Sequence, residues 1–213
     1  MPPRRGHDSL AGMCNLYRLP TDRWELAALY GAVDTVGADL EKDYVSPGRT
    51  GLTITAADGG RRLQSMRWGF PPPPNVRSAV VNVRNYASPF WRSALNNPER
   101  RCLVPVTRFQ EWSVEADPAT GRKTPHWFSL PSRPIFAFAG VWRPTATGPA
   151  YAFLTTGYDG DPAGHLVGAV HPKAMPVILH DEDHDQWLHA PVEVALTLAT
   201  SYPSQLMAID AAT

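Results

Sequence analysis

Prolines and short apolar runs limit the folds that are open to this chain. Its 213 residues include 22 prolines, and proline breaks helix interiors and is confined to the edges and ends of strands. The intervening apolar runs are of strand length and lie at 102–106, 127–128, 135–139, 151–155 and 175–179. Frequent turns between such runs predict an α+β fold with a mostly antiparallel, curved β-sheet or open barrel and a few flanking helices.

Local signals predict one hairpin and two helices within this fold. Residues 52–68 contain two strand-like runs on either side of an Asp-Gly-Gly turn, which predicts a β-hairpin. A helix is expected over residues 21–30, where Thr21 is a suitable N-cap. A second helix is expected to begin at Ser88-Pro89, where a capping residue is followed by proline at the first helical position.

Length and composition favour a single domain. A chain of 213 residues that is 43% apolar buries one sizeable core. Residues 1–12 are polar and rich in proline and glycine, so we expect a disordered extension or a mis-assigned start there, and one domain over 13–213. No run approaches the roughly 20 apolar residues of a membrane span, and the first residues lack the apolar stretch of a secretory signal. We therefore expect a cytoplasmic monomer without a membrane partner, associated with the nucleoid if the source is bacterial.

Cysteine usage limits the chemistry that the chain can support. Cys14 and Cys102 are the two cysteines, too few for a disulfide scaffold and without the paired spacing of a zinc site. Both are expected to be free thiols, and Cys102, which lies in an apolar run, is expected to be buried and structural. The sequence therefore predicts no metal and no cofactor.

Charge is unevenly distributed along a chain whose formal net charge is zero. Residues 61–143 carry 13 basic and four acidic side chains, a net charge of +9, while both flanking segments are acidic. Guanidinium groups match phosphate oxygens bidentately, so an arginine-rich segment suits a groove that binds nucleic acid. The alternative is a solvated surface that is rich in arginine and has no such ligand.

Besides the two cysteines, three polar residues are candidate catalytic residues: Glu111, His171 and Asn82. Glu111 lies between Phe109 and Trp112, and burial among such neighbours would raise its pKa and make it a proton donor near neutral pH. Its alternative role is an ion pair with a nearby arginine. His171 is a candidate for proton transfer, although a lone histidine before a strand-like run is more often structural. Asn82 has a turn or cap role as its alternative.

The order and the local sequences of these segments resemble those of the SRAP family, which carries the historical name SOS response-associated peptidase. The resemblance extends from Met13 to about Leu188 and includes several collinear motifs. The matching segments are Met13-Cys14, Arg67-Trp68-Gly69-Phe70, Asn82-Val83-Arg84, Arg101-Cys102-Leu103-Val104-Pro105, Glu111-Trp112, Ala139-Gly140-Val141-Trp142, Thr155-Thr156 and His171-Pro172-Lys173-Ala174-Met175-Pro176.

The resemblance implies a SRAP-like domain that captures abasic sites in single-stranded DNA. An abasic site exists partly as a ring-opened aldehyde, and an N-terminal Cys14 would present an amine and a thiol two carbons apart. The amine would form an imine with the aldehyde, and the thiol would close on the imine carbon to give a thiazolidine. An α-amine has a pKa of about 7.7–8.0, so a useful fraction is unprotonated at neutral pH.

The resemblance also implies a role for each site residue. Glu111 would be the acid and base that opens the sugar ring and moves protons, and His171 would assist proton transfer, including reversal or strand cleavage. Asn82 would hold the amine and thiol of Cys14. The implied DNA contacts are Arg84, Trp68, Arg18, Arg67, Thr156 and Lys173.

Trp68 has two interpretations within that set. Its ring would stack on a neighbouring base, a contact worth about 1–3 kcal/mol in single-strand binders, or it would be an ordinary core residue, since large aromatic side chains are usually buried.

The sequence departs from the family pattern in three places. Twelve residues precede Met13, and an internal cysteine has no free α-amine. We therefore expect translation to start at Met13 with removal of that methionine, or cleavage of the extension. After the cysteine, Asn15-Leu16-Tyr17-Arg18 replaces the commoner Gly-Arg of the family, and Arg18 is the candidate substitute for the missing arginine. Lys173 stands where arginine is usual, and lysine neutralises a phosphate without bidentate geometry.

Two other functions remain open from the sequence. In the first, the protein is a cysteine hydrolase or autopeptidase with Cys14 as nucleophile, His171 as base and Asn82 as orienting group. In the second, it is a non-enzymatic module that binds single-stranded DNA through the basic segment, with an affinity that falls steeply with salt.

Overall fold

The protein is described here by a computed structural model, which covers residues 14–37, 43–74, 76 and 78–210. The expectations for residues 1–12 and for Met13 lie outside these residues. The helices are α1 (Arg23–Tyr30), α2 (Pro89–Leu95), α3 (His184–His189) and α4 (Val192–Ala195). The strands are β1 (Tyr17–Arg18), β2 (Ala32–Asp34), β3 (Tyr44–Val45), β4 (Thr50–Ala57), β5 (Gly60–Trp68), β6 (Asn82–Val83), β7 (Arg101–Val106), β8 (Arg108–Ala116), β9 (Lys123–Ser129), β10 (Phe136–Thr145), β11 (Gly148–Thr156), β12 (Met175–Pro176), β13 (Ile178–Leu179) and β14 (Ala208–Asp210).

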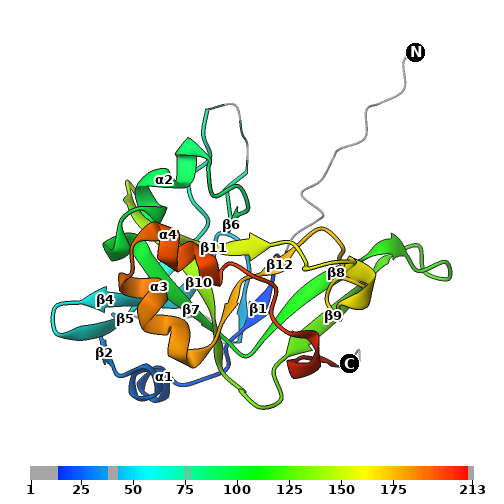
Figure 1. The fold of residues 1–213 in the computed structure, drawn as a ribbon, viewed down its shortest axis with the longest axis horizontal. Helices are drawn as coiled ribbons and strands as arrows, with labels where there is room; N and C mark the ends of the chain where they lie inside the picture. Colours follow the sequence, from blue (N-terminus) through cyan, green and yellow to red (C-terminus); the bar gives the residue numbers. More distant parts are fainter. Residues whose placement is uncertain (1–13, 38–42, 75, 77, 211–213) are drawn as a thin grey trace.

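Five strands of the larger sheet form a closed barrel (Figure 1). Antiparallel pairing connects β5, β4, β7, β10 and β11 in that order. The ring closes through a parallel pairing of β11 with β5, in which Ala150 lies opposite Arg67 and Tyr151 opposite Trp68. The predicted α+β fold with a mostly antiparallel barrel and flanking helices is therefore confirmed, and the predicted hairpin over 52–68 is β4–β5.

A second sheet, in the order β14-β9-β8-β1-β3, lies beside the barrel. Its β8 and β9 form a long hairpin that projects from the body of the molecule (Figure 1). The short strand β1 pairs antiparallel with β8, with Tyr17 opposite Phe109. This register continues toward the N-terminus, where the main-chain N–H of Gln110 donates to Leu16 at 3.0 Å. The segment that carries Cys14 is thereby fixed against β8.

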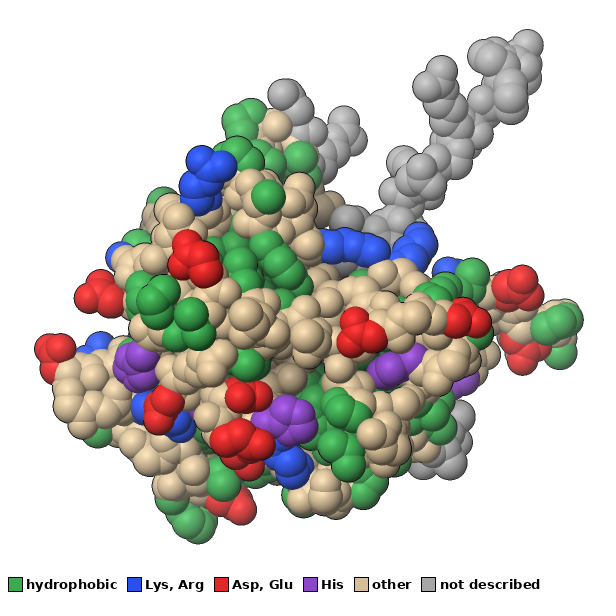
Figure 2. Space-filling view, viewed as in Figure 1, with side chains coloured by type: hydrophobic (Ala, Val, Ile, Leu, Met, Phe, Trp, Pro, Cys, Tyr) green, Lys and Arg blue, Asp and Glu red, His purple; other side chains and the backbone are tan. Residues whose placement is uncertain are grey.

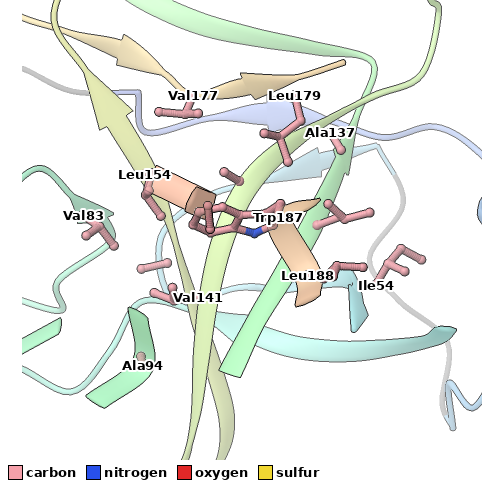
Figure 3. Close-up of a cluster of buried hydrophobic side chains, with 14 of the residues drawn as sticks. Ile54, Val83, Ala94, Ala137, Val141, Leu154, Val177, Leu179, Trp187 and Leu188 are labelled. Atoms are coloured by element: carbon pink, nitrogen blue, oxygen red, sulfur yellow. The ribbon is translucent and has the colours of Figure 1, made fainter. Parts of the chain in front are cut away.

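The barrel strands bury both of their faces. Successive side chains of a strand point to opposite faces, and Phe138 and Phe153 belong to one buried cluster while the adjacent Ala137 and Leu154 belong to another. Figure 3 shows Trp187 of α3 within the second cluster, beside Leu154 and close to the barrel strands. Burying each large apolar side chain contributes about 1.5–3 kcal/mol, so the helices are held to the barrel by this cluster.

Helix ends follow the sequence signals with one correction. The helix α1 begins at Arg23 with Asp22 as its N-cap, so the expected cap at Thr21 is wrong. It ends at Gly31, which adopts the left-handed conformation (φ 57°) that favours glycine. The Ser88 side chain accepts a hydrogen bond from the main chain of α2 as predicted, a contact worth about 1 kcal/mol. Among the described helices, none is long and apolar enough to span a membrane.

Candidate active site

Cys14 and Glu111 lie together at the junction of β1 and β8. Both side chains are about 1% exposed, and the backbone N–H of Cys14 donates a hydrogen bond toward the Glu111 carboxyl group. The Cys14 thiol lies 3.7 Å from the carbonyl oxygen of Leu16. The β1–β8 pairing therefore brings the nitrogen and sulfur atoms of Cys14 to a buried carboxyl group.

Glu111 is a neutral acid at neutral pH. Burial raises its pKa from 4.5 to about 8, and the hydrogen bond from the Cys14 backbone opposes this rise. The ionisable partner recorded for its carboxyl group is His171, with 3.9 Å between Glu111 Oε2 and His171 Nδ1. The direction of this shift agrees with the sequence-based expectation, and no arginine pairs with Glu111 among the residues that the structure describes.

His171 approaches Glu111 from the segment that leads into β12. Its Nδ1 lies 2.9 Å from the carbonyl oxygen of Ala174. A carbonyl oxygen only accepts, so Nδ1 carries the hydrogen and Nε2 of the neutral ring is an acceptor. Within the described residues, Nε2 is buried and has no hydrogen-bond partner. Nε2 of the neutral ring therefore has a lone pair that none of the described residues uses.

Asn82 completes the group from the first residue of β6. It is buried at 4% exposure, and β6 runs parallel to β11 with Asn82 opposite Phe153. Its amide nitrogen lies 3.5 Å from the Cys14 carbonyl oxygen, and its Oδ1 has no partner among the described residues. Cys14, Asn82, Glu111 and His171, which are far apart in the sequence, thus lie in one buried cluster that we call the Cys14 site.

The Cys14 thiol is protonated at neutral pH. Burial raises its pKa well above the ordinary value, and the charge of Glu111 raises it further. Cysteine nucleophiles of hydrolases instead have lowered pKa values beside a histidine or another cation. The recorded side-chain contacts of His171 are with Glu111 and Ala174. The geometry therefore does not favour the hydrolase interpretation. Cys102 is a buried free thiol, as predicted.

Trp68 is a core residue, and its suggested stacking on a DNA base is wrong. Its side chain is fully buried, its Nε1 donates to the Val81 carbonyl oxygen at 3.0 Å, and its ring lies 5.1 Å from that of Phe153. A base cannot reach either face of the ring.

The other suggested DNA contacts differ in exposure. Arg84 and Lys173 are exposed and adjacent, since Arg84 donates to the Lys173 carbonyl oxygen at 2.6 Å. Arg67 is exposed, whereas Thr156 is half-buried and donates to a carbonyl oxygen at 3.0 Å. Arg18 is half-buried and lies over the ring of a tyrosine at 4.5 Å.

Several arginines of the basic segment have structural partners. Arg101 is fully buried and donates to three carbonyl oxygens. Arg61, Arg108 and Arg133 each pair with an aspartate, and Arg143 lies 4.3 Å from the centre of a phenylalanine ring. On the face shown in Figure 2, Lys and Arg side chains lie in several separate places. The basic side chains of residues 61–143 therefore do not form one continuous stripe on this face.

Sequence reasoning missed Tyr158. Its hydroxyl group donates to the His171 carbonyl oxygen at 2.8 Å, and its phenol lies close enough to Glu111 for the carboxylate charge to raise its pKa in addition to burial. No motif marks this tyrosine, and the loop that connects β11 to β12 brings it to the site. Sequence reasoning also did not assign β8 as a strand.

The relatives that this chain resembles in sequence share one kind of name. The chain is 32% identical over 152 residues to "Abasic site processing protein YoqW" of Bacillus subtilis, a match that covers 68% of this chain and 65% of that protein. "Abasic site processing protein YobE" of the same organism matches at 32% over 152 residues, covering 68% and 67%. The matched part of this chain thus spans about two thirds of the length of these relatives.

Solved structures share the fold. A crystal structure of a protein from Bordetella bronchiseptica has a TM-score of 0.73 at 23% identity, covering 94% of this chain and all of that one. A protein from Bacteroides thetaiotaomicron has a TM-score of 0.74 at 23% identity, covering 92% and 90%. The sequence model of one family, described as "SOS response associated peptidase (SRAP)", matches residues 13–212. With nearly its whole described length matched by the family model, this chain belongs to the SRAP family.

Proposed function

We propose that this protein processes abasic sites in DNA by capturing the ring-opened aldehyde covalently through Cys14. The curated relatives are named for abasic site processing. The observation that carries the proposal is the position of the Glu111 carboxyl group, which faces the backbone nitrogen of Cys14. That nitrogen becomes the α-amine when Cys14 is the first residue, so the reactive form begins at Cys14.

The reaction needs no reagent besides the protein and the lesion. The Cys14 amine adds to the aldehyde, and the resulting carbinolamine loses water to give an imine. The thiol then adds to the imine carbon, and its proton passes to the nitrogen, which closes a thiazolidine ring. The product weighs one water molecule less than the protein and DNA together.

Glu111 supplies the proton transfers of both steps. Its pKa of about 8 keeps it protonated at neutral pH, so it donates a proton to the hydroxyl group that leaves as water. The carboxylate that remains then accepts the proton of the Cys14 thiol, whose own raised pKa means that it needs a base. One buried carboxyl group therefore acts first as an acid and then as a base.

His171 and Asn82 hold and assist this chemistry. The amide of Asn82 binds the Cys14 carbonyl oxygen and fixes the residue whose two ends react. Through its unused Nε2, His171 assists the proton transfers of capture as well as those of reversal or strand cleavage. Arg84 and Lys173, which are exposed and adjacent, bind phosphates that flank the lesion in single-stranded DNA.

The test compares two forms of the protein, one beginning at Cys14 and one retaining residues 1–13. Each is incubated with single-stranded DNA that contains one abasic site, and the products are resolved by denaturing electrophoresis and intact mass. We expect a band that survives denaturation, of the mass stated above, from the form that begins at Cys14 alone. Cys14→Ala abolishes the band, and the matched control Cys102→Ala retains it. Absence of the band from a folded protein beginning at Cys14 refutes covalent capture.

A further inference from the structure

We propose that Tyr158 is a positioning residue that fixes His171 in the Cys14 site, through the loop between β11 and β12. This inference rests on the proposed function for its catalytic consequence. Its structural content, the orientation of the His171 ring, is measurable without any reaction.

The backbone of His171 is held on both sides. Its N–H donates to the Val167 carbonyl oxygen at 2.8 Å, and its carbonyl oxygen accepts the Tyr158 hydroxyl at 2.8 Å. The ring is then oriented by the contact of Nδ1 with Ala174. The two backbone hydrogen bonds fix the position of His171, and the Nδ1 contact then selects one side-chain rotamer.

Tyr158 is itself fixed by a neighbouring histidine. The rings of Tyr158 and His165 have centroids 4.8 Å apart. Nδ1 of His165 accepts N–H groups of Val167 and Gly168 at 3.1 and 3.4 Å, and its Nε2 lies 2.8 Å from the Tyr202 carbonyl oxygen. Since an N–H only donates and a carbonyl only accepts, His165 is neutral with its hydrogen on Nε2. The loop therefore folds around this ring, and the Tyr158 ring packs on it.

The loop between β11 and β12 is tightly packed at Gly168. A Cβ atom placed there would lie 2.2 Å from the carbonyl oxygen of Pro162, which is far inside van der Waals contact. The loop is thus closely packed where it turns toward His171, and a displacement of Tyr158 would be transmitted to that residue.

The Tyr158 hydroxyl group remains a hydrogen-bond donor near neutral pH. Burial raises the pKa of Tyr158, and the charge of the nearby Glu111 raises it further. The hydroxyl group therefore keeps its proton, and the same proximity places Tyr158 beside both members of the Glu111–His171 pair.

Tyr158→Phe removes the hydrogen bond and keeps the ring on His165. In single-turnover cross-linking, we expect the maximal rate to fall about threefold to tenfold, the loss expected of one hydrogen bond. The DNA concentration at half-maximal rate stays close to that of the unsubstituted protein, and the melting temperature falls by only a few degrees, as expected for one lost hydrogen bond. An unchanged maximal rate, or a loss confined to DNA affinity, overturns the proposal.

A double-mutant cycle separates action through His171 from a general effect. In a His171→Gln background, Tyr158→Phe should cause no further loss of rate, because the residue that it positions is gone. Tyr86→Phe is the matched control, since it removes a bond of the same kind, from a phenol hydroxyl to the Thr155 carbonyl oxygen at 2.8 Å. Its effect should be equal in both backgrounds. An equal loss from Tyr158→Phe in both backgrounds contradicts a role through His171.

Imidazole nitrogen NMR tests the same claim without DNA. The unsubstituted protein should show His171 with its hydrogen on Nδ1, and Tyr158→Phe should shift the His171 signals more than those of His189 in α3. If no cross-link forms in any variant, the proposed function fails while this spectrum still decides the role of Tyr158. Unshifted His171 signals overturn it.

Discussion

Glu111 Oε2 and His171 Nδ1 lie 3.9 Å apart in the core, with both side chains at 6% exposure or less. A carboxylate and an imidazolium at this distance would form an ion pair, yet burial holds the pKa of Glu111 at about 8 and keeps it protonated at neutral pH. The Glu111 carboxyl group is therefore neutral beside the His171 ring, and its ionisation at higher pH costs folding stability because a charge is then buried.

Stability should fall with rising pH because of Glu111. Its pKa is about 8 in the folded protein and 4.5 ordinarily, so between these values the folded state holds a proton that the unfolded chain releases. The free energy of unfolding then decreases with pH in this window, by at most about 1.4 kcal/mol per pH unit. Urea unfolding across this range measures the slope. Glu111→Gln should flatten it, and the exposed Glu115→Gln should not; equal slopes for Glu111→Gln and the unsubstituted protein would contradict the assignment.

Capture should have a bell-shaped pH dependence. The rate rises as the α-amine loses its proton near pH 7.7–8.0, and it falls above about pH 8, where Glu111 ionises and ceases to be an acid. Single-turnover cross-linking at pH values from about 5 to about 10 measures both limbs of the profile. Glu111→Gln should lower the optimum rate by about 10²–10⁴ and remove the alkaline limb. Persistence of that limb in Glu111→Gln would assign it to another group.

Asn82→Ala should slow capture while leaving the fold intact. It removes the hydrogen bond to the Cys14 carbonyl oxygen, a contact worth about 0.5–1.5 kcal/mol, or roughly a twofold to twelvefold loss of rate. Cross-linking kinetics and thermal unfolding are measured together. Asn97→Ala, which removes a main-chain cap at the start of a 3₁₀ turn, is the control, and it should affect stability without slowing capture.

Arg84→Ala and Lys173→Ala should each weaken DNA binding in a salt-dependent way. If each side chain contacts one phosphate, its removal lowers the slope of log affinity against log salt by about one. Equilibrium binding to single-stranded DNA at several salt concentrations measures this slope. Arg62→Ala, an exposed arginine on β5, is the control. Loss of affinity with an unchanged slope would show that Arg84 acts on structure instead.

Trp68→Phe should destabilise the protein without changing its affinity for DNA. The substitution leaves a void beside Phe153 and removes the bond from Nε1 to Val81, for which we expect a loss of about 1–3 kcal/mol. Thermal unfolding and single-strand binding are compared. A loss of affinity in a protein of unchanged stability would restore the stacking interpretation.

The sequence was informative where the signal is local or carried by a motif. The β4–β5 hairpin and the Ser88 cap follow from residues adjacent in the chain, and the site cluster follows from family motifs. Arginine content was a poor guide, because Arg101 is buried among carbonyl oxygens. An amino-acid count cannot distinguish a guanidinium group that binds phosphate from one that donates hydrogen bonds to carbonyl oxygens at the end of a helix.

Other features depend on contacts between distant segments. The parallel pairing of β11 with β5 that closes the barrel joins strands separated by much of the chain. Tyr158 reaches His171 through the shape of a loop, and Trp68 is buried by residues from two other strands, β1 and β11. Periodicity and spacing do not encode such contacts.

The parallel seam between β5 and β11 also determines when Asn82 and His171 reach the Cys14 site. Contacts between distant segments form late because the intervening chain must first lose its freedom. Glu111 lies before β11 in the chain, Asn82 pairs with β11, and His171 follows it. As the seam closes, Asn82 and His171 would come to Cys14, whereas Glu111 reaches Cys14 through the separate pairing of β1 with β8. Folding would thereby complete the Cys14 site in two separate steps, one in each sheet.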